Sequence, residues 1–201
     1  MTKLLLFSDL HADVAAAEDI VRLATDVDII VGAGDFGNGR RHVERCIDVL
    51  KSISKPAVLV AGNNESTDEL RGACAVWPSA VVLHGTGVTI AGIPFFGLGG
   101  GVPVTPFGSW SYDFDEDQAR SLLEACPAGA VLVSHSPPKG AVDVSSSGRS
   151  LGSVAVREVV DRRKPRLVVC GHIHASGGRS EVVDGVDVVN AGPIGVKWTL
   201  G

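Results

Sequence analysis

Aspartate, asparagine and histidine residues follow five of the short apolar runs of this sequence, at the point where each run ends. In RLVVCGHIHASGG, residues 166–178, two histidines stand two positions apart, so both imidazoles can point the same way at the end of an extended segment. The carboxyl ends of strands in an open α/β sheet are where ligands bind. The residues that this pattern selects are Asp9, His11, Asp35, Asn63, His135, His172 and His174.

This mixture of side chains indicates a metal site. Carboxylate, imidazole and amide ligands together favour first-row ions such as Mn²⁺, Fe, Zn²⁺, Co²⁺ or Ni²⁺ over an all-oxygen Ca²⁺ or Mg²⁺ site. Seven side chains are too many for one such ion and suit two ions that share a carboxylate. Two metals about 3.5–4 Å apart commonly activate a water and hold a phosphoryl group. Two dications, two carboxylates and one hydroxide leave about one positive charge, which attracts an anionic phosphate ester.

The elements that must position these residues follow a repeating order. Early strands alternate with helices, which favours right-handed crossovers and a largely parallel sheet, whereas the later strands suggest a second sheet. The long irregular stretches 95–113 and 136–153 have lengths typical of functional loops. Strands are predicted at 3–7, 27–32, 57–62, 80–83, 87–93, 130–135, 166–171 and 185–191, and helices at 14–25, 39–52, 115–125 and 153–163.

Composition sets limits on the class of protein. With 201 residues, 45% hydrophobic and 20% charged, the chain predicts one globular domain over residues 1–201. No apolar stretch reaches the roughly 20 residues of a membrane helix, so we expect no membrane partner. The net charge is −5, and basic residues cluster only at 39–41 and 161–166, which argues against nucleic-acid binding. Four scattered cysteines without a C-x-x-C pair are interpreted as reduced thiols of a cytoplasmic protein.

The motifs SDLH, GD, GNNE, SHSPP and GHIH, in this order at strand ends, resemble those of the calcineurin-like metallophosphoesterases, in particular the small single-domain bacterial and archaeal type. The resemblance extends from Asp9 to the NAGP at 190–193. It implies a four-layer αββα sandwich of two mixed sheets flanked by helices, with two divalent ions and Mn²⁺ as the expected metal. One ion is expected to bind Asp9, His11, Asp35 and His174, and the other Asp35, Asn63, His135 and His172.

The resemblance also implies an activity. A hydroxide bridging the two ions would attack the phosphorus of a small-molecule phosphodiester or phosphomonoester. Two alternatives stay open: a nuclease of the same family, which needs an electropositive groove, and a non-catalytic scaffold on the same fold, which has no need of seven metal ligands. The substrate, the native metal and the oligomeric state are open as well.

Several other residues have weaker assignments. Loop residues Asn38, Arg40 and Arg149 are candidates for substrate phosphate or for solvated positions, and Glu65 and Asp143 for supporting or capping groups. His42 and His84 are expected to be surface or packing residues. The aromatic residues of the long loop can line a substrate cleft, form a dimer contact or fix the loop to the core; they are Phe107, Trp110 and Tyr112.

The sequence departs from the family pattern at Asn64, where the family usually has a histidine beside the leaving group. Asn64 can donate a hydrogen bond to the phosphate or the leaving group, but it cannot transfer a proton near pH 7. We therefore expect activity to be retained on activated esters and diesters and to be low on esters with poor leaving groups.

Asn64→His is expected to raise turnover of an alkyl phosphate ester, up to the roughly 10²–10⁴-fold that general acid catalysis supplies. Turnover of a matched nitrophenyl ester should change little, because its leaving group needs no proton. Steady-state rates on the two esters measure the difference. An unchanged rate on the alkyl ester would show that Asn64 does not limit proton transfer.

Overall fold

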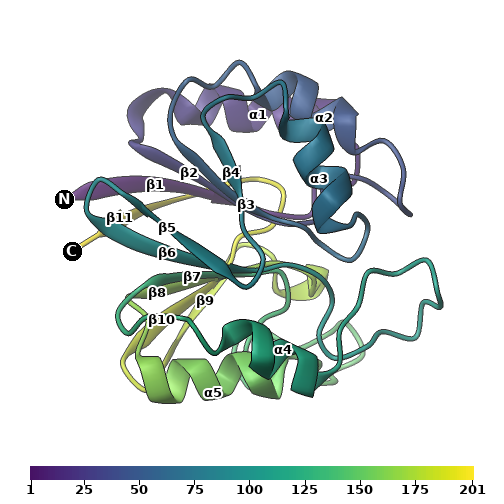
Figure 1. The fold of residues 1–201 in the computed structure, drawn as a ribbon, viewed down its shortest axis with the longest axis vertical. Coiled ribbons are helices and arrows are strands. Elements are labelled where there is room, and N and C mark those ends of the chain that lie inside the picture. Colours follow the sequence, from purple (N-terminus) through teal and green to yellow (C-terminus); the bar gives the residue numbers. More distant parts are fainter.

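The computed structural model describes residues 1–201 and places two β-sheets face to face, with helices on both outer sides (Figure 1). The first sheet has its inner strands in parallel and the C-terminal strand antiparallel at one edge. Its order is β11 (Val196–Leu200), β1 (Thr2–Phe7), β2 (Ile29–Ala33), β3 (Ala57–Val60) and β4 (Ala80–Val82). Helices α1 (Val14–Leu23), α2 (Val43–Leu50) and α3 (Thr67–Cys74) cover its outer face.

The second sheet is also mixed. Its four central strands are parallel, and an antiparallel strand pairs at each edge. Its order is β5 (Thr86–Ile90), β6 (Ile93–Leu98), β7 (Val131–Ser134), β8 (Leu167–Cys170), β10 (Val186–Asn190) and β9 (Arg179–Val183). Helices α4 (Glu116–Leu123) and α5 (Val154–Arg163) cover it, and the short 3₁₀ helices are η1 (Ala24–Asp26) and η2 (His174–Ser176).

Three apolar layers hold these four layers of secondary structure together. The middle layer lies between the sheets and includes Leu4, Val58, Phe95, Val131 and Val169, all at 1% exposure or less. The strands that face both this layer and a helical layer are apolar without alternation, as expected for sheets covered on both sides. The predicted αββα sandwich of two mixed sheets is therefore confirmed. No helix is long and apolar enough to span a membrane.

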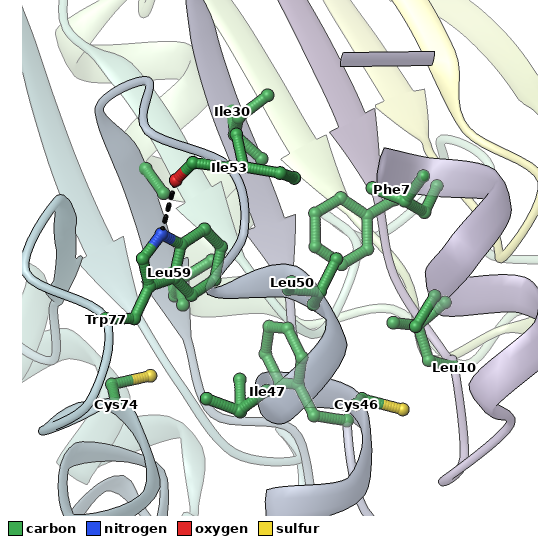
Figure 2. Close-up of a cluster of buried hydrophobic side chains, with 14 of the residues drawn as sticks. Phe7, Leu10, Ile30, Cys46, Ile47, Leu50, Ile53, Leu59, Cys74 and Trp77 are labelled. Atoms are coloured by element: carbon green, nitrogen blue, oxygen red, sulfur yellow. Dashed lines mark hydrogen bonds between the residues drawn. The ribbon is translucent and has the colours of Figure 1, made fainter. Parts of the chain in front are cut away.

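The layer between the first sheet and its helices is closed by Trp77. Its indole is 1% exposed, packs beside Leu59, and donates a hydrogen bond of 2.8 Å to the carbonyl of Ile53 (Figure 2). The polar atom of this large side chain is thereby satisfied, which a buried indole requires. Trp77 fixes the segment after α3 to the segment before β3.

The structure corrects several predicted elements. The strand predicted at 87–93 is the hairpin β5–β6, which turns at Ala91 and Gly92 with positive φ angles of 50° and 77°, so residues 95–98 are strand and not loop. The helix predicted at 39–52 begins at Val43, because residues 38–41 form a turn. Helix α3 and the edge strands β9 and β11 were not predicted. Each has few apolar residues in succession, so the apolar pattern in the sequence is short.

The arrangement brings strand ends from both sheets to one place. The ends of β1, β2 and β3 are neighbours in the first sheet, and the ends of β7 and β8 are neighbours in the second. The ring of His135, after β7, lies 2.7 Å from the carbonyl oxygen of Ala33, at the end of β2. The residues that follow five strands therefore meet at the junction of the two sheets.

Replacing Trp77 is expected to destabilise the fold without touching this junction. Trp77→Ala should lower the free energy of unfolding by about 3–5 kcal/mol, since a large buried side chain is lost. Trp77→Phe keeps most of the apolar surface but leaves the carbonyl of Ile53 with one donor fewer, and should cost about 1–2 kcal/mol. Urea denaturation of both variants measures the two values, and wild-type stability of Trp77→Phe would contradict the role given to the hydrogen bond.

Candidate metal centre

The structure brings four of the predicted side chains into one cluster at the ends of β1, β2 and β8. Asp9, His11, Asp35 and His174 each offer a ligand atom, and these atoms all lie within 4.8 Å of one another. The Nε2 atoms of His11 and His174 are 3.0 Å apart. His174 Nε2 lies 3.6 Å from Asp9 Oδ1, and His11 Nε2 lies 3.7 Å from Asp35 Oδ2. This spacing suits a common cation.

The other three predicted residues form a second group beside the first. Asn63 Oδ1 lies 3.2 Å from His135 Nε2 and 3.1 Å from His172 Nδ1. His135 Nε2 is also 3.5 Å from Asp35 Oδ1. Asp35 thus faces the first group with one carboxylate oxygen and the second with the other. All seven side chains selected from the sequence lie together.

The tautomer of His135 shows that the second group fits a cation. Its Nδ1 is 2.7 Å from the carbonyl oxygen of Ala33, which can only accept, so Nδ1 carries the proton. In the neutral ring Nε2 is then a lone pair, and it faces the acceptor oxygens of Asn63 and Asp35. Three acceptors aimed at one spot require a proton or a cation between them. A divalent ion satisfies all three.

Four of these seven residues have a left-handed backbone conformation. Asp9, His11, Asp35 and His172 have positive φ angles of 58°, 48°, 58° and 65°, a region that residues other than glycine seldom adopt. Each such residue costs on the order of 1–2 kcal/mol. Four of the seven predicted ligands therefore sit in loops that the surrounding structure holds in an unfavourable conformation.

Glu65 supports the loop that carries Asp35. Its buried carboxylate accepts hydrogen bonds from the backbone N–H groups of Asp35 (2.9 Å), Gly37 (2.9 Å) and Gly62 (2.7 Å). Burial and the nearby Asp35 carboxylate raise the pKa of Glu65 to about 7. Glu65 ties the end of β2 to the end of β3, the supporting role that the sequence offered as one option.

Two further supports were not identified from the sequence. Ser8 donates a hydrogen bond of 2.5 Å to Asp9 Oδ2, and its hydroxyl accepts one from the N–H of Gly192. Asn190 is fully buried and donates to the carbonyls of Gly171 and Ile173, both at 3.0 Å. These carbonyls flank His172. The signal was present in SDLH and NAGP, but a serine and an asparagine in such motifs are also common turn residues.

The carboxylates and imidazoles of the cluster shift each other's pKa values. Burial by itself would raise the pKa of Asp9, but the neighbouring His174 and His135 and the Ser8 hydroxyl lower it to about 2. Contact with Asp9 raises the pKa of His174. Burial, reinforced by His135, lowers the pKa of His172 to about 3, so its ring is an available ligand at neutral pH. The carboxylates thus have a positive counterpart, which protons or a metal can supply.

Asn64 lies against the same carboxylate. It is 7% exposed, and its amide nitrogen donates a hydrogen bond of 2.7 Å to Asp35 Oδ2. Its amide oxygen accepts from the N–H of Gly39 at 2.8 Å, which fixes the orientation of the amide. The side chain therefore holds Asp35 in place, a contact that the sequence did not reveal.

A cavity of about 760 Å³ opens over the cluster, between the loops 99–113 and 143–151. Phe107 and Trp110 line it, whereas Tyr112 packs against the apolar layer between the first sheet and its helices, and its hydroxyl donates a hydrogen bond to Thr67. The long loop therefore both lines the cavity and is fixed to the core. The three loop residues considered for phosphate contact, Asn38, Arg40 and Arg149, do not line this cavity. Asp143 has the capping role, because its carboxylate accepts hydrogen bonds from the N–H groups of Gly140 and Gly152.

Comparison with known proteins identifies the family. Residues 2–176 match the model of the calcineurin-like phosphoesterase family. This match covers most of the chain and all seven clustered residues, so the chain belongs to that family. A comparison with curated proteins gives no match.

Solved structures share the fold at low sequence identity. The protein TT1561 of Thermus thermophilus is 20% identical, with a TM-score of 0.76 over 95% of this chain and 89% of that chain. A dimetal phosphatase from Danio rerio is 14% identical, with a TM-score of 0.66 over 96% and 88%. An archaeal phosphodiesterase is 16% identical, with a TM-score of 0.54 over 94% and 83%.

The close approach of Gly62 to Asp35 gives a direct test of the cluster. A Cβ atom on Gly62 would clash with both Oδ1 and the backbone nitrogen of Asp35, so Asp35 must move. We expect Gly62→Ala to weaken Mn²⁺ binding by at least about 10-fold, comparable to the loss of a supporting group in other metal sites.

The matched control is Gly72→Ala in α3, where a Cβ atom meets nothing within 4 Å. This variant should bind Mn²⁺ like the wild type and gain about 0.5–1 kcal/mol of stability. Isothermal titration calorimetry of both variants measures the affinities. Wild-type affinity in Gly62→Ala would mean that Asp35 does not take part in metal binding.

Proposed function

We propose that this protein is a metal-dependent phosphoesterase that hydrolyses phosphodiesters or phosphomonoesters of small molecules at a centre of two divalent ions. The observation that carries the proposal is the position of Asp35. Its two carboxylate oxygens face two separate groups of ligands, one with His11 and one with His135. Membership of a phosphoesterase family supports the same reaction class.

The proposed ligand sets follow the two groups. The first ion would be held by Asp9, His11, Asp35 and His174, and the second by Asp35, Asn63, His135 and His172. Mn²⁺ is the proposed metal, with Fe, Zn²⁺, Ni²⁺ and Co²⁺ as alternatives that the same mixture of oxygen and nitrogen ligands accepts. When bound, the ions would supply an activated water and positive charge for the phosphoryl oxygens.

The chain's own residues orient this centre. Asn64 and the backbone N–H of the same residue both donate to Asp35, at 2.7 and 2.9 Å, which fixes the shared carboxylate. The amide of Asn64 has a second N–H, which we propose donates to a phosphoryl or leaving-group oxygen in the cavity. His135 is oriented by the carbonyl of Ala33, the kind of outer partner that metal-binding histidines usually have.

The scaffold alternative predicts no hydrolysis. Seven metal-ligand side chains, four of them held in strained backbone, would serve no purpose in a surface that only binds a partner. Five of the seven side chains line a cavity, which supports an enzyme instead: His11, Asp35, Asn63, His172 and His174.

Hydrolysis of bis(4-nitrophenyl) phosphate and 4-nitrophenyl phosphate by metal-stripped protein tests the proposal. Activity is expected to be absent without metal and to return with Mn²⁺ or another first-row ion. Asp35→Asn should lower kcat/KM at least about 100-fold, because the carboxylate shared by the two ions is lost. Asp68→Asn, at an exposed position on α3, should leave it unchanged. Inactivity with every ion would favour the scaffold.

A further inference from the structure

The cavity over the metal centre has two chemically different parts. Every titratable residue that lines it belongs to the cluster at its floor: His11, Asp35, His172 and His174. The walls above are apolar side chains and hydroxyl groups. The wall residues with the largest apolar surface are Pro103, Val104, Phe107, Trp110 and Leu151.

Exposed apolar surface is concentrated in these walls. Eleven large apolar side chains of the chain are exposed, and four of them, Val104, Phe107, Trp110 and Leu151, line this cavity. The rings of Phe107 and Trp110 stack with centroids 5.9 Å apart and planes at 17°, while both stay about half exposed. Contiguous exposed apolar surface beside a polar centre is typical of a ligand-binding site.

The first wall, formed by the loop 99–113, is hydrogen-bonded to the proposed metal centre. The amide nitrogen of Asn63 donates to the hydroxyl of Ser111 at 3.0 Å, and the N–H of Tyr112 donates to the carbonyl of Asn63 at 3.0 Å. Asp113 accepts hydrogen bonds from Ser111 and from Thr105, which closes the loop. The loop that carries Phe107 and Trp110 therefore has a fixed position relative to a proposed metal ligand.

The second wall, formed by the loop 143–151, is held by hydrogen bonds in the same way. The hydroxyl of Ser176, in η2 with His174, donates to the carbonyl of Val144 at 3.1 Å. The buried carboxylate of Asp143 accepts from Ser150 and from the N–H of Gly152 on either side of Leu151. Both walls are thus preformed, and preformed surface binds without the entropic cost of ordering a loop.

No lysine or arginine lines the cavity. Arg40 donates to Glu69 at 2.8 Å and to the backbone carbonyl of Trp110 at 3.2 Å. Arg40 therefore stabilises the loop that carries Trp110. The positive charge available to a substrate in this cavity would come from the metal centre, which suits a single phosphate group.

We propose that the preferred substrate carries one phosphate group with a bulky, uncharged apolar substituent. This substituent would bind between the stacked rings of Phe107 and Trp110 on one side and Leu151 on the other. This inference rests on the proposed phosphoesterase function and adds the class of substrate. The phosphate lies over the cluster, and the substituent covers the apolar walls. The chemistry selects against esters that carry additional phosphates or carboxylates.

The test uses the Mn²⁺-loaded protein and two diesters with the same leaving group, 4-nitrophenyl phenyl phosphate and 4-nitrophenyl methyl phosphate. We expect kcat/KM to be about tenfold or more higher for the phenyl ester, mainly through KM, because the walls would contact the ring equally in the bound substrate and in the transition state. Trp110→Ala should remove most of this preference, because it should lower kcat/KM for the phenyl ester much more than for the methyl ester. Trp110→Phe should retain much of the preference.

Binding supplies a readout that does not depend on turnover. Titration calorimetry should give a Kd for phenylphosphonate about tenfold lower than for methylphosphonate, and Trp110→Ala should abolish the difference. The control variant is Val182→Ala, because Val182 is exposed on β9, outside the cavity. It should match the wild type in both assays.

The outcomes separate the two proposals. Hydrolysis of both diesters at equal efficiency, or a phenyl preference that survives in Trp110→Ala, overturns this inference and leaves the phosphoesterase function intact. Absence of hydrolysis and of phosphonate binding with every metal overturns the function itself. A concentration-dependent dimer of the wild type that Trp110→Ala dissociates would show that a second copy of the chain covers these walls, which also overturns the inference.

Discussion

The position of one buried carboxylate governs the arrangement of this site. Asp35 is 2% exposed and lies between two groups of polar side chains, with His11 near one oxygen and His135 near the other. A carboxylate removed from water must be matched by positive charge and by hydrogen bonds. Asn64 holds the carboxylate by a hydrogen bond, and Gly62 leaves the space that it occupies. The backbone carbonyl of Ala33 orients His135.

The double sheet provides the stability that this arrangement needs. Strained backbone at Asp9, His11, Asp35 and His172 works against folding, and such strain persists only where the surrounding structure fixes it. Here the strained residues directly follow strands buried in three apolar layers. The buried strands stabilise the fold, and the short segments after them carry the clustered side chains.

The sequence predicted which side chains lie together because the signal is local. Each of Asp9, Asp35, Asn63, His135 and His172 follows a recognisable apolar run, and parallel strands bring such positions to one edge. The αββα architecture followed from the resemblance of the ordered motifs.

Other features depend on contacts between distant segments, which a single sequence does not encode visibly. The contact of Asn64 with Asp35 joins residues 29 positions apart, and that of Ser111 with Asn63 joins residues 48 positions apart. In the edge strands β9 and β11 polar residues interrupt the apolar ones, so the continuous apolar run of the inner strands is missing, and α3 has only a short buried face. Positive φ angles at aspartate and histidine likewise arise from tertiary packing, because these residues favour negative φ on their own.

The most direct measurement is a crystal structure of the manganese-loaded protein with anomalous scattering recorded near the manganese absorption edge. The account predicts two anomalous peaks about 3.5–4 Å apart, one within the group of Asp9, His11 and His174 and one within the group of Asn63, His135 and His172, with Asp35 between them. A single peak, or none among these side chains, would contradict it.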